Sequence, residues 1–320
     1  MSTSSNKIVI NVFEGERLFV NEIILSENQL RALASNKFLR YLTIHIGTYI
    51  GVWGAEILAT SNNLISLNLA QNAIGDEGAK ELAKLSTLRH LNLSYNNIHD
   101  EGAKELSRMS LRSLDVSKNY IGDEGAEFLA SSTTLRYLNV QNNYIRAAGA
   151  KKLADNKSLR SLNIAFNDIG IKGAKALASN TSLRSLNLAS SNINDNDAKY
   201  LAKNTSLRFL SLAANYISDE GAKILHDNTT LRYLDVSNNH MRDEGAKILA
   251  LNTSLWYLNL SSYHMTTRGV KSIIDLYKTI ISTPELVIQS ELIEVKIPAK
   301  NGILSKTIPR AIKRYYWFFN

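Results

Sequence analysis

Hydrophobic and polar residues alternate over short stretches of the chain and then change to a helical spacing, and this change recurs along most of its length. In one stretch, Leu67 and Leu69 alternate with polar residues, which is typical of a strand. The segment DEGAKELAKL that follows places Ala79, Leu82 and Ala83 on one face of a helix. The pattern predicts strand–helix repeats that bury their apolar faces only when they are stacked.

The repeat is 24 residues long, with one repeat of 25 and one of 23, and ten repeats cover about three-quarters of the chain. Its template is L-x-x-L-x-L-x-x-N-x-I followed by a segment like GDEGAKELA. With the first Leu of each repeat as position 0, the repeats begin at Leu39, Leu64, Leu88, Leu111, Leu135, Leu159, Leu183, Leu207, Leu231 and Leu255. Stacking them predicts a parallel sheet on a concave side and helices on a convex side.

Two columns of asparagine recur in the repeats. Position +8 is expected to be a buried ladder in which each amide bonds the backbone of its own and the next turn, interrupted at Gly47, Ser191 and Tyr263. Its members are Asn72, Asn96, Asn119, Asn143, Asn167, Asn215 and Asn239. A second column is expected to end the helices in a left-handed conformation and comprises Asn156, Asn180, Asn204, Asn228 and Asn252.

Charged residues also form columns. Position +1 is Arg in eight of ten repeats: Arg40, Arg89, Arg112, Arg136, Arg160, Arg184, Arg208 and Arg232. We expect these arginines to bond the last free carbonyls of the preceding helix and to complement its dipole, whereas the alternative is a basic stripe for an acidic partner. Asp-Glu pairs, such as Asp76-Glu77, are expected in the first turns of the helices.

A partner site is predicted where the repeats differ from one another. Positions +2 and +4, Ser161 among them, are expected to be exposed on the concave side. Three consecutive repeats carry an aromatic residue at +2, and the last of them has Trp in place of Arg at +1. Aromatic residues and Arg dominate protein interfaces, so the predicted site comprises Arg208, Phe209, Arg232, Tyr233, Asp235, Trp256 and Tyr257. The alternative is that the stacked rings only stabilise neighbouring strands.

The pattern divides the chain into three parts. Residues 1–38 are expected to be a tail and a capping hairpin, with two alternating strands within residues 7–24. Residues 39–275 form the repeat domain, and residues 276–320 a C-terminal cap with a basic aromatic tail. Residues 309–320, PRAIKRYYWFFN, are expected to dock on the last repeat; the alternative is a helix that binds a membrane surface or a partner.

Composition narrows the classes of function. The absence of cysteine excludes disulfides and thiolate chemistry. The net charge is +8, but residues 295–320 hold six basic residues and no acid, which leaves +2 for the rest and argues against nucleic-acid binding. There is no signal-peptide pattern and no long apolar run, so a soluble protein of a reducing compartment is expected.

Catalytic motifs are missing from the sequence as well. It contains no Walker A, G-x-S-x-G or H-E-x-x-H motif, so we expect a non-enzymatic protein without a cofactor. His240 and His264 share position +9 and should lie roughly 5 Å apart on neighbouring strands. Without a third ligand they are expected to be exposed loop residues rather than a metal site.

These repeats resemble the leucine-rich-repeat family, which implies an α/β solenoid shaped like a horseshoe. The 24-residue repeat with GAKELA and GAKALA is most similar to GALA-type repeats of effectors that bacteria inject into host cells; other such effectors occur in Legionella. The resemblance implies a module that binds a host protein on its concave face, made in the bacterial cytoplasm and secreted. GALA effectors carry an F-box before the repeats, and residues 1–38 show none; an adaptor role in a host ubiquitin ligase is the alternative.

Overall fold

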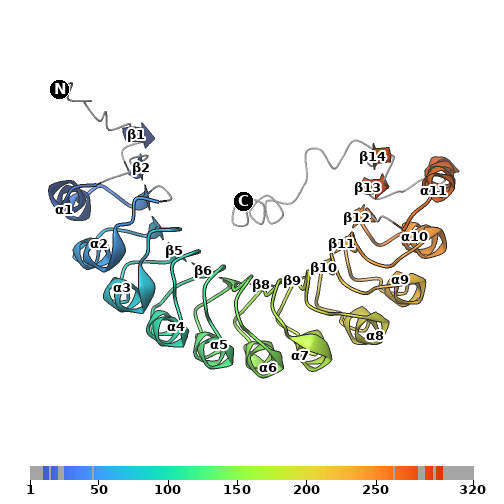
Figure 1. The fold of residues 1–320 in the computed structure, drawn as a ribbon, viewed down its shortest axis with the longest axis horizontal. Coiled ribbons are helices and arrows are strands. Elements are labelled where there is room, and N and C mark those ends of the chain that lie inside the picture. Colours follow the sequence, from blue (N-terminus) through green and yellow to red (C-terminus); the bar gives the residue numbers. More distant parts are fainter. Residues whose placement is uncertain are drawn as a thin grey trace. The chain divides into compact units, whose positions relative to one another are not determined.

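The computed structural model describes residues 10–13, 16–20, 25–44, 47–261, 264–279, 285–290 and 293–297. It forms two compact units, unit 1 (Met1–Leu186) and unit 2 (Asn187–Asn320), whose boundary falls in β9 (Ser185–Asn187). In each unit, strands and helices alternate along the chain, and the helices cover one face of the sheet (Figure 1). We call the opposite face the open face.

Unit 1 begins with an antiparallel pair of strands and continues with parallel strands in chain order. Its strands before β9 are β1 (Ile10–Phe13), β2 (Arg17–Val20), β3 (Tyr41–Ile44), β4 (Ser66–Asn68), β5 (His90–Asn92), β6 (Ser113–Asp115), β7 (Tyr137–Asn139) and β8 (Ser161–Asn163). Its helices are α1 (Glu27–Ser35), α2 (Gly51–Leu58), α3 (Gly75–Leu82), α4 (Asp100–Ser107), α5 (Asp123–Ala130), α6 (Ala147–Asp155) and α7 (Gly170–Ala178).

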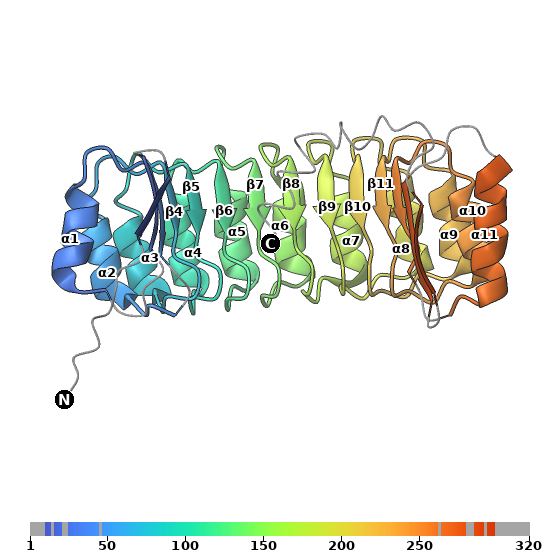
Figure 2. The ribbon, with the colours of Figure 1, turned by 90° about the horizontal axis from the view of Figure 1, so that it is seen from above.

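Unit 2 repeats the same arrangement and ends on an antiparallel pair. Its strands after β9 are β10 (Phe209–Ser211), β11 (Tyr233–Asp235), β12 (Tyr257–Asn259), β13 (Glu285–Ser290) and β14 (Ile293–Ile297). Its helices are α8 (Asp195–Ala202), α9 (Asp219–His226), α10 (Asp243–Ala250) and α11 (Thr267–Thr279). Figure 2 shows the strands of each unit side by side in front of the helices.

The core lies between the sheet and the helices because the leucines of the template point there. In the repeat that begins at Leu231, Leu234 of β11 and Val236 directly after it are fully buried, as are Ala246 and Leu249 of α10. Burying one such leucine stabilises the fold by about 1.5–3 kcal/mol. The sequence prediction of parallel strands that alternate with helices is therefore confirmed in both units.

The +8 asparagines form the predicted buried ladder, but their direction differs from the prediction. The Nδ2 group of Asn119 donates to Leu93 O of the preceding repeat (2.9 Å) and to Val116 O (3.0 Å) and Ser117 O (3.1 Å) of its own turn. Its Oδ1 accepts from Ile98 N of the preceding repeat (3.0 Å). Each amide thus reaches back to the turn before it rather than forward to the next one.

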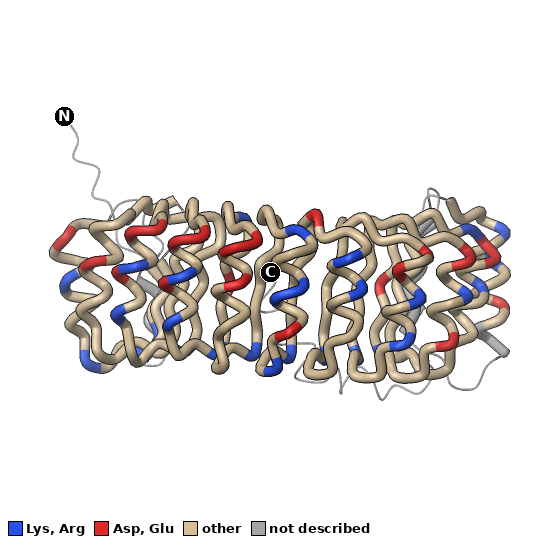
Figure 3. Tube along the Cα trace, turned by 90° about the horizontal axis from the view of Figure 1, so that it is seen from below, with Lys and Arg blue, Asp and Glu red and all other residues tan. Residues whose placement is uncertain are grey.

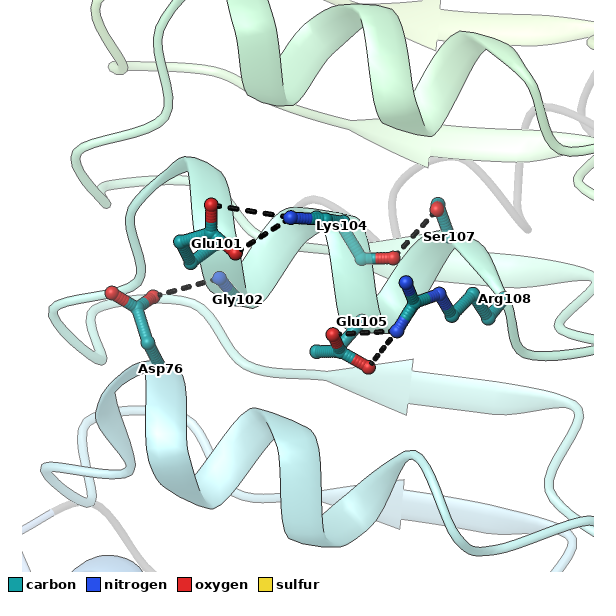
Figure 4. A network of polar contacts seen from close by, with 7 residues as sticks. All are labelled: Asp76, Glu101, Gly102, Lys104, Glu105, Ser107 and Arg108. Carbon is teal, nitrogen blue, oxygen red and sulfur yellow. Dashed lines mark hydrogen bonds and ion pairs between the residues drawn. The ribbon is translucent and has the colours of Figure 1, made fainter.

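The first acid of each Asp-Glu pair caps the helix of the following repeat, which the sequence prediction missed. Asp76 Oδ1 in α3 accepts from His99 N (2.7 Å) at the start of α4. It also accepts from Gly102 N (3.1 Å), as Figure 4 shows. Asp123 does the same for Gly149 N (2.8 Å) in α6. The glycine of the D-E-G segment is required because a Cβ at Gly102 would overlap this carboxylate.

The asparagines at the helix ends do not adopt the left-handed conformation that the sequence predicts. Asn156 follows α6 with φ −66° and ψ 130°, in the extended region. Its side chain explains why asparagine occurs here: Nδ2 donates to Ala130 O at the end of α5 (2.7 Å) and to Ser132 O (2.8 Å). Oδ1 accepts from Leu159 N (2.8 Å). The column therefore ties each turn to the helix end of the preceding repeat.

The ends of the chain are only partly described. The two alternating strands expected within residues 7–24 are present as the antiparallel pair of β1 and β2. Beyond residue 276, β13 adds to β12 in parallel and pairs with β14. Tyr263 and residues 309–320, and with them the expected ladder interruption and the expected cap or membrane helix, lie outside the described residues. In the part of the chain that is described, no helix has the length and apolar character needed to cross a membrane.

Candidate functional site

The three aromatic residues predicted at position +2 form one stack on the open face of unit 2. Parallel pairing places Phe209 beside Tyr233 and Tyr233 beside Tyr257. The ring centroids are 4.1 Å and 4.2 Å apart, with interplanar angles of 15° and 3°. The register of β10, β11 and β12 produces this geometry because neighbouring strands lie about 4.8 Å apart, which is also a stacking distance for rings. We call these three residues the aromatic stack.

The members of the predicted site differ in how much surface they offer a partner. Tyr233 is only 8% exposed because rings cover both of its faces, so it contributes packing rather than contact area. Phe209 and Tyr257 are half-buried, and Trp256 is 45% exposed at the start of β12. Arg232 Cζ lies 5.7 Å from the centre of the Trp256 ring, a cation–π contact. The accessible aromatic surface therefore comes mainly from Trp256, Tyr257 and Phe209.

The arginines at position +1, which we call the arginine column, bond other carbonyls than the sequence predicts. Arg136 Nη1 donates to the carbonyls of Thr133 (3.0 Å), Thr134 (3.2 Å) and Leu135 (3.1 Å), in the loop that follows α5. Arg208 and Arg232 of the predicted site bond their preceding loops in the same way. The helix-end carbonyls are bound instead by the asparagine column, as Ala130 O shows.

Asp235 lies beside the aromatic stack at position +4, where most repeats carry Asn. Its Oδ1 accepts from Ser237 N (3.0 Å) and Ser237 Oγ (2.7 Å). Burial raises the pKa of the Asp235 carboxyl, and these hydrogen bonds only partly offset the effect. A carboxyl whose pKa is higher in the folded state than in the unfolded state opposes folding when it is ionised.

We therefore expect Asp235→Asn to stabilise the protein at neutral pH. The wild type gains stability relative to the variant as the pH falls through the raised pKa of Asp235, because protonation removes the buried charge. Thermal melts of both proteins between pH 4 and pH 7 measure the difference. A difference that does not change across this range would contradict the expectation.

Not every outward position is exposed, which corrects the sequence prediction for Ser161. This residue is 2% exposed, and Ser113 and Ser185 are buried as well. Tyr137 lies next to Ser161 in the sheet. A serine side chain is too short to rise above such a neighbour, so the Tyr137 side chain shields Ser161 from solvent.

Exposed rings also lie at position +9, where the sequence indicates only a solvent-facing edge. In unit 1, Tyr120 stacks on Tyr144 (5.9 Å between centroids) and on His99, which lies at position +11 of the preceding repeat (5.1 Å). In unit 2, His240 and His264 lie 5.7 Å apart, edge to face, close to the predicted spacing. The described residues contain no group of three or more His, Asp or Glu side chains arranged to hold a metal ion.

Two sequence models of one protein family match the repeats of this chain. A leucine-rich-repeat model matches residues 109–169, and a second one matches residues 60–83, 84–107, 179–202, 203–225 and 227–250. Together these matches cover more than half of the chain. No curated protein sequence matches the chain.

Solved structures of other proteins have a similar fold. An internalin (inlF) from Listeria monocytogenes is 24% identical, with a TM-score of 0.52 over 80% of this chain and 84% of that one. A TLR13–ssRNA13 complex is 20% identical, with a TM-score of 0.55 over 79% of this chain and 37% of that one. At these identities the likeness shows the fold alone. With the matched repeats, the asparagine ladder and the alternating strands and helices, the chain belongs to the leucine-rich-repeat family.

Proposed function

We propose that this protein is a non-enzymatic module that binds another protein through the open face of unit 2. The observation that carries the proposal is the aromatic stack with Trp256 at its edge. Rigid rings lose little conformational entropy on binding and are enriched at interface hot spots. Arg208, Arg232 and Asp235 lie around the rings and would orient the partner by their charges.

The position of Trp256 distinguishes a binding role from strand stabilisation. Stacking alone accounts for the +2 rings, because neighbouring rings stabilise a parallel sheet. It does not account for Trp256, which lies at position +1, where eight of ten repeats have Arg, and remains 45% exposed. A large exposed ring that replaces a hydrogen-bonded arginine favours a partner rather than packing.

In this proposal the protein is an effector that a bacterium secretes into its host, and its partner is a protein of that host. The similarity of the GAKELA-type repeat to GALA repeats of injected effectors supports this part. The leucine-rich-repeat fold supports a protein partner, because scaffolds of this family typically mediate protein–protein interaction.

The test replaces site residues with the residues that other repeats carry at the same positions, so the fold should be retained. We expect the double variant Trp256→Arg/Tyr257→Ser to lose at least ~2 kcal/mol of binding free energy for a protein captured from host-cell lysate. The variant should melt within a few degrees of the wild type. Affinity is measured on the captured partner by calorimetry.

Tyr137→Ser is the matched control, because it makes the same change at position +2 of unit 1, outside the aromatic stack. It should bind as tightly as the wild type. Full affinity of a well-folded double variant would show that the open face of unit 2 is not the site. Capture of a partner only from bacterial lysate would contradict the effector role.

A further inference from the structure

The arginine column of unit 1 is a row of positive charges without a negative partner. Five of its six arginines are consecutive and form what we call the arginine row: Arg89, Arg112, Arg136, Arg160 and Arg184. Arg40 stands apart because the next repeat has Ile65 at this position. The ion pairs among the described residues of the chain involve other basic side chains, and none includes an arginine of this row. No carboxylate among the described residues therefore compensates the charge of this row.

The arginines lie directly beside one another. The N–H group of Arg136 donates to Arg112 O (2.9 Å), that of Arg160 to Arg136 O (2.9 Å) and that of Arg184 to Arg160 O (2.8 Å). Neighbouring residues in such a ladder are about 4.8 Å apart, which is well within a Debye length of about 8 Å. Like charges at this spacing repel one another, and an anionic ligand would remove that repulsion.

Hydrogen bonds to backbone carbonyls orient the guanidinium groups of four of these arginines. Arg89, Arg136, Arg160 and Arg184 each donate from Nη1 to carbonyls of the preceding loop. Arg160 Nη1 also reaches Ser182 O in the next repeat (3.5 Å). A guanidinium carries five N–H donors, and the carbonyl bonds use Nη1 alone, so Nε and Nη2 remain to bind a carboxylate in a forked geometry.

The opposite edge of the same repeats is acidic, and several of its charges are already paired. Glu77 contacts Lys80 (3.6 Å) and Glu101 contacts Lys104 (3.0 Å). Figure 3 shows the acidic segments of unit 1 gathered toward the edge where the helices begin, with basic segments toward the other edge. A second copy of the chain would offer these neutralised acids, so it does not fit the row; an external acidic partner does.

We propose that the arginine row of unit 1 binds the acidic face of a helical segment in a partner protein. Carboxylates three or four residues apart on a helix are separated by about 4.5–6 Å along its axis, close to the spacing of the arginines. A single-stranded nucleic acid fits less well, because it requires aromatic rings between the charges. The two residues before each arginine of the row are Ser or Thr followed by Leu. This surface is separate from the aromatic stack.

The test uses the full chain and an alanine-based helical peptide with Glu at every fourth position. We expect the wild type to bind this peptide, to bind a Gln version of it at least about tenfold more weakly, and to lose affinity as salt rises. Arg136→Gln/Arg160→Gln should weaken binding about tenfold or more. Arg136→Lys/Arg160→Lys, which keeps the charge but loses the forked bonds, should bind more weakly than the wild type and more tightly than the Gln variant.

The charge-matched control is Lys151→Gln/Lys172→Gln, because both lysines are exposed on helices away from the row. It should bind the peptide as the wild type does. Equal binding of the Glu and Gln peptides, an equal loss in the lysine control, or tighter binding of a single-stranded RNA of the same charge would each overturn the proposal. Thermal melts show whether the Gln variant loses peptide binding only because it unfolds. In that case the Lys variant decides: binding of the Glu peptide by this variant supports the proposal, and no binding overturns it.

Discussion

Asn167→Ala is expected to destabilise unit 1 by about 3 kcal/mol or more, because several buried backbone groups lose their partner at once. Asn167 Nδ2 donates to Val140 O (2.9 Å), Ile164 O (3.1 Å) and Ala165 O (3.1 Å). Its Oδ1 accepts from Ile145 N (3.0 Å). Alanine can replace none of these bonds, and Asn167 is buried in its turn. Thermal or urea unfolding of the variant measures the loss.

A control for this experiment must lie on the surface of the same sheet, and Ser161 is unsuitable because it is buried. Ser66 occupies the same position in an earlier repeat and is half-exposed. We expect Ser66→Ala to change the free energy of unfolding by less than about 0.5 kcal/mol. Similar, small losses for Asn167→Ala and Ser66→Ala would show that the ladder does not stabilise the fold.

Gly269→Ala is expected to destabilise unit 2, although alanine favours a helix over glycine by about 1 kcal/mol. A Cβ at Gly269 in α11 would overlap the carboxylate of Asp243, which comes from α10. That carboxylate cannot move away without cost, because its Oδ1 accepts from Thr266 N (2.8 Å). The variant must either strain the helix or give up this cap, and we expect a loss of about 1–3 kcal/mol.

The partner variant Asp243→Ala separates the clash from the helix propensity. Alone it removes the cap and should cost about 1 kcal/mol. In Asp243→Ala/Gly269→Ala the overlap is gone and alanine regains its helical advantage, so the double variant should be more stable than the sum of the single losses by at least ~1 kcal/mol. Chemical denaturation of the four proteins completes the cycle. Additive losses would mean that the carboxylate does not exclude a side chain at residue 269.

The sequence predicts those features of the fold that depend on one repeat alone. Leu67 and Leu69 identify a strand by their alternation, and a buried amide such as Asn119 follows from a polar residue in an apolar turn. Contacts between repeats were predicted less well. The direction of the ladder and the helix-end carbonyl bound by Asn156 depend on where the neighbouring repeat lies, and a repeat pattern does not state this.

Some of the missed features nevertheless left a signal. Helix α1 begins at a capping box in which Ser26 N donates to Gln29 Oε1 (2.7 Å), and the spacing of these residues is visible in the sequence. Asp and Gly also recur together in the D-E-G segments. This joint recurrence is the trace in the sequence of the close contact between the Asp of one repeat and the Gly of the next. The register of the aromatic stack followed from the repeat length. The burial of Tyr233 did not, because it depends on the height of the rings on either side.

The capping aspartates favour folding of the repeats in the order in which they are synthesised. Asp76, Asp123 and Asp219 each cap a helix that lies later in the chain, at His99, Gly149 and Arg242. During synthesis, each carboxylate therefore leaves the ribosome before the helix that it caps. The acceptor for the first N–H groups of each new helix is then already present in the preceding repeat, so folding from the N-terminus need not leave a helix start uncapped. Growth in the reverse direction would leave each such helix without its cap until another repeat had formed.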